Sequence, residues 1–171
     1  MIREQPTHGR DVFLAATVSQ ENRAYVRDYM LMEGIAFRVV PRRVVDDVNT
    51  ERGWELLNDY FYRGLDDPGV YKDDQACQLV RNYVSAYHRL AYEYISRNDG
   101  ERARQCCDLS MALLETMPEV RRDVLAASTL VRSRVTDGLE GPAAAAESTL
   151  ATAAWFSAQA EITGDRNLSA L

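Results

Sequence analysis

Two short apolar runs, separated by a more polar stretch, set the first forty residues apart from the rest of the chain. Residues 11–18 form an apolar, partly β-branched run, and residues 35–40 form a second run that ends at Pro41. Both runs predict strands. The second is expected to end at Pro41, because proline cannot continue a strand's hydrogen-bond ladder. Between them, residues 23–32 have the pattern of a short amphipathic helix, with Gly34 as its C-terminal stop. The sequence therefore predicts a small strand–helix–strand unit with a buried first strand, compatible with a parallel pair.

From Thr50 onward the apolar residues recur with the 3.6-residue period of helices. Thr50 is a good N-cap for a helix that extends to Phe61. Turn-forming residues at 64–69 then predict a loop. Asp73 or Asp74 can be the N-cap of the helix that follows this loop.

The clearest pattern in the chain belongs to two consecutive helices joined by Asn98, Asp99 and Gly100. Spacings of three and four place one apolar stripe on the first helix: Val80, Tyr83, Val84, Tyr87, Leu90, Ala91, Tyr94 and Ile95. The second helix, followed by Pro118, carries its own stripe: Ala103, Cys106, Cys107, Ser110, Leu113, Leu114 and Met117. The pattern predicts an antiparallel helical hairpin.

The spacing within this hairpin resembles that of a tetratricopeptide repeat. Tyr87, Leu90, Ala91 and Tyr94 fall at the positions of the repeat's first helix, and Ala103 follows nine residues after Tyr94. The small residues let two helix backbones approach closely. Because Pro118 comes about three residues late, the second helix is expected to be roughly a turn longer than in the consensus. A generic helical hairpin is the alternative, with the same core.

Residues 121–162 are expected to form a second, divergent helix pair without the aromatic signature. The first of these helices spans about residues 121–135, and residues 137–141 form a loop. Pro142 lies in the first turn of the second helix, where proline is tolerated, and residues from Gly164 look frayed. The side chains expected to face inward on the first helix are Val124, Ala127, Leu130 and Val131.

The predicted fold is therefore mainly α, with tetratricopeptide-like antiparallel helical hairpins after a small strand–helix–strand unit. We place the small unit at residues 1–48 and the helical part at residues 49–171, packed together as one domain.

Composition and charge indicate a globular protein that does not bind nucleic acid. The chain has 46% apolar and 27% charged residues, which is typical of a globular protein. The net charge of −6 argues against nucleic acid as a partner, because phosphate binding requires a basic surface. No run approaches the ~20 apolar residues of a membrane span, and the N-terminus lacks a signal-peptide core. The chain as given is expected to be water-soluble.

Candidate catalytic chemistry is sparse. Cys106 and Cys107 fall on a helical stripe and are interpreted as packing residues, and three cysteines do not make a disulfide framework. Lys72 is the only lysine and lies among aspartates, and neither His8 nor His88 has a metal-ligand spacing to a partner. The acidic pairs at residues 66–67 and 73–74 are interpreted as helix-capping groups. The sequence predicts no catalytic residue, no metal and no cofactor.

One polar face of the first hairpin helix is a candidate binding surface for a protein or peptide partner. An arginine, a histidine and a tyrosine at helical spacing could clamp a carboxylate or an extended peptide. A solvated helix face is the alternative interpretation. The residues of this candidate surface are Arg81, Ser85, His88, Tyr92 and Ser96. Glu33 and Arg38, by contrast, are expected to form a structural pair.

Two segments resemble motifs of a known family. Residues 29–41, with the run at 11–18 before them, are similar to a motif near the end of certain large bacterial membrane proteins. Residues 61–71 resemble that family's next motif, and a helix like that at residues 83–94 follows it there. The family was long a domain of unknown function. Its membrane portion resembles protein O-mannosyltransferases and related glycosyltransferases, and its soluble tail is tetratricopeptide-like.

The resemblance covers about residues 10–118 and implies a non-catalytic interaction or accessory tail, since the transferase chemistry would belong to the membrane portion. It also implies a location on the extracytoplasmic face of the cytoplasmic membrane, as part of the parent protein. A free-standing cytoplasmic adaptor is the first alternative. The second is an enzyme whose site is assembled from distant residues.

Overall fold

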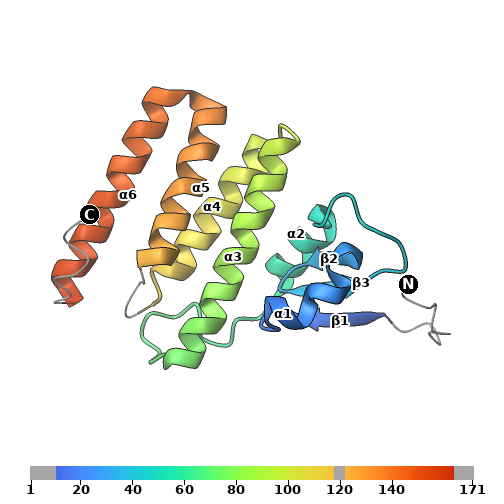
Figure 1. The fold of residues 1–171 in the computed structure, drawn as a ribbon. Coiled ribbons are helices and arrows are strands. Elements are labelled where there is room, and N and C mark those ends of the chain that lie inside the picture. Colours follow the sequence, from blue (N-terminus) through green and yellow to red (C-terminus); the bar gives the residue numbers. More distant parts are fainter. Residues whose placement is uncertain (1–10, 118–121, 164–171) are drawn as a thin grey trace. The chain divides into compact units, whose positions relative to one another are not determined.

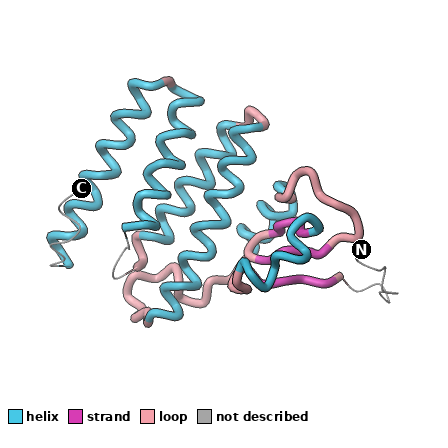
Figure 2. Tube along the Cα trace, in the orientation of Figure 1, coloured by secondary structure: helices cyan, strands magenta, loops and turns pink. Residues whose placement is uncertain are grey.

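The computed structural model describes residues 11–117 and 122–163. This part of the chain is mainly helical, with a small three-stranded sheet near its N-terminus (Figure 1, Figure 2). The predicted fold class is confirmed. Up to Phe61 the described residues form one compact unit, and from Tyr62 onward they form a second. The predictions for Pro118 and for the residues from Gly164 lie outside the described residues.

The sheet of the first unit contains β1 (Val12–Ala15), β2 (Met30–Glu33) and β3 (Ala36–Val39), in the order β1–β3–β2. Every pairing is antiparallel. The strand–helix–strand pattern suggested a parallel pair, but the sequence pattern did not reveal β2. The chain reverses direction between β2 and β3, so that β3 lies antiparallel to both β1 and β2. β1 is bonded only to β3 within the described sheet, and its Phe13 side chain is 50% exposed. The predicted burial of the first strand is therefore wrong.

The helix predicted at residues 23–32 is only partly confirmed. α1 (Gln20–Arg23) and the 3₁₀ segment η1 (Ala24–Tyr29) precede β2, which takes up the last residues of the predicted helix. Gly34 and Ile35 form the two-residue turn from β2 to β3, and Gly34 has a φ of 61°. A glycine with positive φ fits both the C-terminal end of a helix and the turn of a β-hairpin. Strand pairing, which is a tertiary property, decides between the two.

α2 (Thr50–Asp59) follows the sheet and packs against β2. Its N-cap is Asn49, one residue before the predicted Thr50, and the Asn49 side chain accepts a hydrogen bond from the Arg52 N–H at 3.3 Å. The helix ends before Phe61, which is exposed. Because α2 contacts the sheet, it belongs to the first unit, and the division of the chain comes after α2 instead of at the predicted boundary after residue 48.

Replacing Gly34 with alanine is expected to destabilise the β2–β3 hairpin by about 1–2 kcal/mol, because an L-residue at positive φ is strained. The added methyl group would also lie 2.5 Å from the hydroxyl oxygen of Tyr60, so that this side chain would have to shift. Hydrogen–deuterium exchange of the β2–β3 segment measures this change. Gly138→Ala is the matched control, since a methyl group there meets no atom within 4 Å and alanine favours a helix. Equal exchange of the segment in the Gly34 variant and the unmodified protein would contradict the prediction.

The second unit contains α3 (Asp74–Ser96), α4 (Gly100–Leu114), α5 (Arg122–Glu140) and α6 (Pro142–Thr163). α3 packs along α4, and α5 packs along α6, so that the four helices make two antiparallel hairpins (Figure 1). α5 also lies against both α3 and α4. This stacking of one hairpin on the next is the arrangement expected of helical repeats.

The first hairpin confirms the sequence-predicted core. All five tetratricopeptide-like positions are at most 2% exposed: Tyr87, Leu90, Ala91, Tyr94 and Ala103. Asp73 is the N-cap of α3, and its side chain accepts a hydrogen bond from the Ala76 N–H at 2.8 Å. At the turn into α4, Asn98 has a φ of 59° and Asp99 caps the next helix.

The second hairpin departs from the prediction in register. Val131 is buried as predicted, but Ala127 and Leu130 are exposed, and Ser128 and Val135 are buried in their place. The prediction chose the most apolar positions, but the contacts of α5 with its neighbours select a different face. The predicted loop at 137–141 is also wrong, because α5 continues to Glu140 and only Gly141, with a φ of 89°, ends it.

Within the second unit, specific hydrogen bonds hold the loop that precedes α3. The buried Lys72 ammonium group donates to the backbone carbonyls of Asp67 at 2.6 Å and Val70 at 3.3 Å. The Thr116 hydroxyl donates to the Leu65 carbonyl at 2.8 Å, which ties the loop to the end of α4. Lys72 therefore has a structural place in the loop that precedes α3.

Candidate functional site

The polar face predicted on α3 is only partly exposed. Ser85 and Ser96 are exposed, Tyr92 is 39% exposed, and Arg81 is half-buried. The Arg81 guanidinium group donates to the side-chain oxygen of Gln78 at 2.9 Å, within the same helix. The Ser96 hydroxyl donates to the Glu93 carbonyl at 2.8 Å. Tyr92, Ser85 and Ser96 are therefore accessible on this face, although the hydroxyl of Ser96 is bonded within its own helix.

His88 differs from the other predicted site residues because it is buried, with 8% of its surface exposed. Burial lowers its pKa to about 4, so the imidazole is neutral at pH 7. Its Nε2 atom is buried without a hydrogen-bond partner in the described structure. A neutral, buried imidazole cannot serve as a cationic clamp, and the predicted arginine–histidine–tyrosine constellation is not assembled on the surface.

The structure instead places a polar groove on α4, α5 and α6, with a cavity volume of about 540 Å³. Each helix contributes residues spaced three or four apart, so that one face of each lines the groove. Its apolar part includes Met111, Val135 and Ala151. Its charged residues are Arg104, Asp108, Glu115, Arg132, Glu140 and Glu147.

The charges of this groove are unequal. Four carboxylates face two guanidinium groups, which gives the lining a net charge of −2. The Arg104 guanidinium group forms an ion pair with Glu140, which joins α4 to the end of α5. Asp108 is exposed on the groove side of α4. The groove is therefore suited to a ligand that presents positive charge.

This groove was not predicted from the sequence. Its lining comes from three helices between residues 104 and 152, and the prediction considered the polar face of a single helix. The spacing of Arg104, Asp108 and Glu115 on one face of α4 is visible in the sequence. Only the order in which the helices pack shows that this face lies opposite charged residues of α5 and α6.

The chain matches no family model, no curated protein and no solved structure.

The three cysteines of the chain are in settings that disfavour a reactive thiolate. Burial raises the pKa of both Cys106 and Cys107 to about 12, and it also raises the pKa of Cys77. All three cysteines are buried thiols, which confirms the interpretation of Cys106 and Cys107 as packing residues. No group of three metal-ligating side chains occurs among the described residues. None of the described helices has both the length and the apolar character needed to cross a membrane.

Proposed function

We propose that this protein is a non-catalytic interaction domain whose second unit binds a peptide segment of a partner protein in the α4–α5–α6 groove. The observation that carries the proposal is the groove itself, built on two stacked helical hairpins and lined by acidic residues in excess. Stacked helical repeats commonly bind partners on such extended surfaces. The groove favours a segment with basic side chains, because carboxylates outnumber guanidinium groups in its lining.

The setting of the nucleophiles supports a binding function over a catalytic one. A catalytic thiol needs a lowered pKa and access to substrate, and the three cysteines have neither. His88 is neutral and buried, so it does not offer a general base at the surface.

Binding of a basic peptide is expected to depend on the acidic lining, and Asp108→Arg is expected to weaken it at least about tenfold, because like charges then oppose each other. The ligands are peptides selected from a displayed random library for binding to the full chain, and fluorescence anisotropy measures their affinity. Raising the salt concentration is expected to weaken binding as well, since salt screens these charges.

Glu101→Arg is the matched control, because Glu101 is exposed on α4 but does not line the groove. Arg81→Ala and Tyr92→Ala test the face of α3 that the sequence indicated. The assignment to this groove would be contradicted if the selected peptides contained no basic residues. It would also be contradicted if their affinity depended on Tyr92 and not on Asp108.

We further propose, from the motif resemblance at residues 29–41 and 61–71, that the domain is an accessory part of a membrane glycosyltransferase-like protein. That origin predicts hydrophobic spans encoded directly upstream of Met1 and an extracytoplasmic location. A free-standing cytoplasmic adaptor would have a natural start at Met1 and no such spans. Sequencing the upstream coding region distinguishes the two.

A further inference from the structure

The first unit contains a second cavity, of about 540 Å³, which the proposed function does not use. It lies between one face of the sheet and one face of α2. The strand register places Phe13 opposite Arg38 and Glu33 opposite Ala36, so these side chains share a face. The residues that line the cavity are Asp11, Phe13, Glu33, Ala36, Arg38, Asn49, Arg52, Leu56 and Tyr60.

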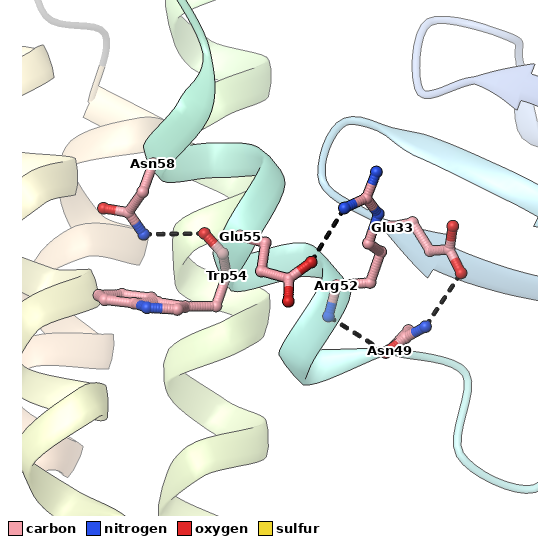
Figure 3. A network of polar contacts seen from close by, with 6 residues as sticks. All are labelled: Glu33, Asn49, Arg52, Trp54, Glu55 and Asn58. Carbon is pink, nitrogen blue, oxygen red and sulfur yellow. Dashed lines mark hydrogen bonds and ion pairs between the residues drawn. The ribbon is translucent and has the colours of Figure 1, made fainter.

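A buried carboxylate organises this cavity. The Glu33 side chain is only 7% exposed, and its Oε1 atom accepts hydrogen bonds from Arg38 Nε at 3.1 Å and Asn49 Nδ2 at 3.0 Å. The predicted structural pair of Glu33 and Arg38 is confirmed by this contact. Figure 3 shows Glu33 facing the start of α2, where Asn49 and Arg52 lie. Because Glu33 binds the guanidinium group through Nε, it fixes the direction of the Arg38 side chain.

Donor groups remain on both arginines of the cavity. In the described structure, the hydrogen bonds of the Arg38 side chain use Nε, and those of the Arg52 side chain use Nη1, which donates to Glu55 at 2.9 Å. The Arg52–Glu55 pair is exposed and therefore weak. A guanidinium group has five N–H donors, so both arginines retain donors for an acceptor placed between them.

We propose that this cavity binds a carboxylate attached to an apolar group, with Arg38 and Arg52 as the carboxylate-binding residues. The fork of N–H groups on arginine matches a carboxylate, and Phe13 and Leu56 offer apolar walls to the rest of the ligand. The two arginines are balanced by Asp11 and Glu33, so the lining has no net charge. This balance favours a monoanionic carboxylate over a dianionic phosphate.

The volume accommodates either a small carboxylic acid or the last residues of a peptide with a free C-terminus. Titration of the full chain, followed by the backbone NMR signals of Asn49 and Arg52, distinguishes the two. The probes are 4-methylpentanoate, an acetylated Ala-Ala-Leu peptide with a free carboxylate, the same peptide as its C-terminal amide, and inorganic phosphate. Saturable shifts with both carboxylates identify a small-acid site, and shifts with the free peptide alone identify a C-terminus site.

Arg52→Ala is expected to weaken binding of the carboxylate probe about tenfold or more, the usual effect of losing a charge-assisted hydrogen bond. Arg52 is the residue to change, because Arg38 also compensates the buried Glu33. Arg43→Ala is the matched control, since Arg43 forms an exposed ion pair with Asp28 and does not line the cavity.

The proposal is overturned if neither carboxylate shifts these signals at about 10 mM, or if the amide and phosphate bind as well as the free acid. It is equally overturned if Arg43→Ala reduces the affinity as much as Arg52→Ala. Because the cavity belongs to the first unit, these results leave the peptide groove of α4–α6 to its own test.

Discussion

Truncation of Tyr87 to alanine is expected to destabilise the second unit by about 3–5 kcal/mol, the range found when a large aromatic side chain is removed from a core. Tyr87 is 2% exposed, and its ring lies at a tetratricopeptide-like position on the stripe of α3 that packs along α4. Its hydroxyl group lies 3.1 Å from the hydroxyl of Tyr62. Losing the ring therefore removes apolar contacts and leaves a cavity between the two helices.

Tyr87→Phe is the matched control, because it keeps the ring and removes only the hydroxyl contact. We expect it to cost about 1 kcal/mol, as for a single neutral hydrogen bond. Urea unfolding followed by circular dichroism at 222 nm measures both variants. A cost for Tyr87→Ala that does not exceed that for Tyr87→Phe would mean that residues 78–117 do not form the packed hairpin on which the proposed groove depends.

Acidification is expected to destabilise the protein by about 3 kcal/mol through His88, once the pH is below its pKa in the folded state. The folded-state pKa of about 4 lies below the usual value of 6.5, so the unfolded chain binds the proton more tightly. The contribution of His88 to the free energy of unfolding is fully present above about pH 6.5 and declines as the pH falls toward about 4. About 2 kcal/mol is expected to be lost by pH 5.

His88→Leu is expected to remove this dependence, because leucine has a similar volume and does not titrate. The comparison is made in a His8→Gln background, so that His88 is the only histidine, by urea unfolding at a series of pH values between about 7 and 4.5. At pH 7 the leucine variant is expected to be at least as stable, since a buried Nε2 without a partner is lost. Parallel pH profiles for the two proteins would show that His88 is accessible to water after all.

The first hairpin could be predicted in detail from sequence. Tyr87, Leu90, Ala91, Tyr94 and Ala103 recur at spacings that only a pair of packed helices satisfies, and all are buried. Local capping chemistry located the start of α3 to within one residue, at Asp73, but for α2 the cap is Asn49 and not the predicted Thr50.

Short elements could not be predicted in the same way. The pattern predicts a helix over residues 23–32, yet its last three residues belong to β2, because a four-residue strand has too few positions to distinguish the two periods. On α5, the sequence places both Leu130 and Val131 inward, and the neighbouring helices decide that only Val131 of the two is buried.

The sequence by itself determined the helical class, the first hairpin and its core, because these depend on contacts between residues close in the chain. Only the tertiary structure decided the burial of His88, the antiparallel sheet and the two cavities. The two cavities and the pairing of β1 with β3 depend on which residues meet across elements that are separated in sequence. Periodicity shows which face of a helix is apolar, but it does not show what that face, or the polar face beside it, will lie against.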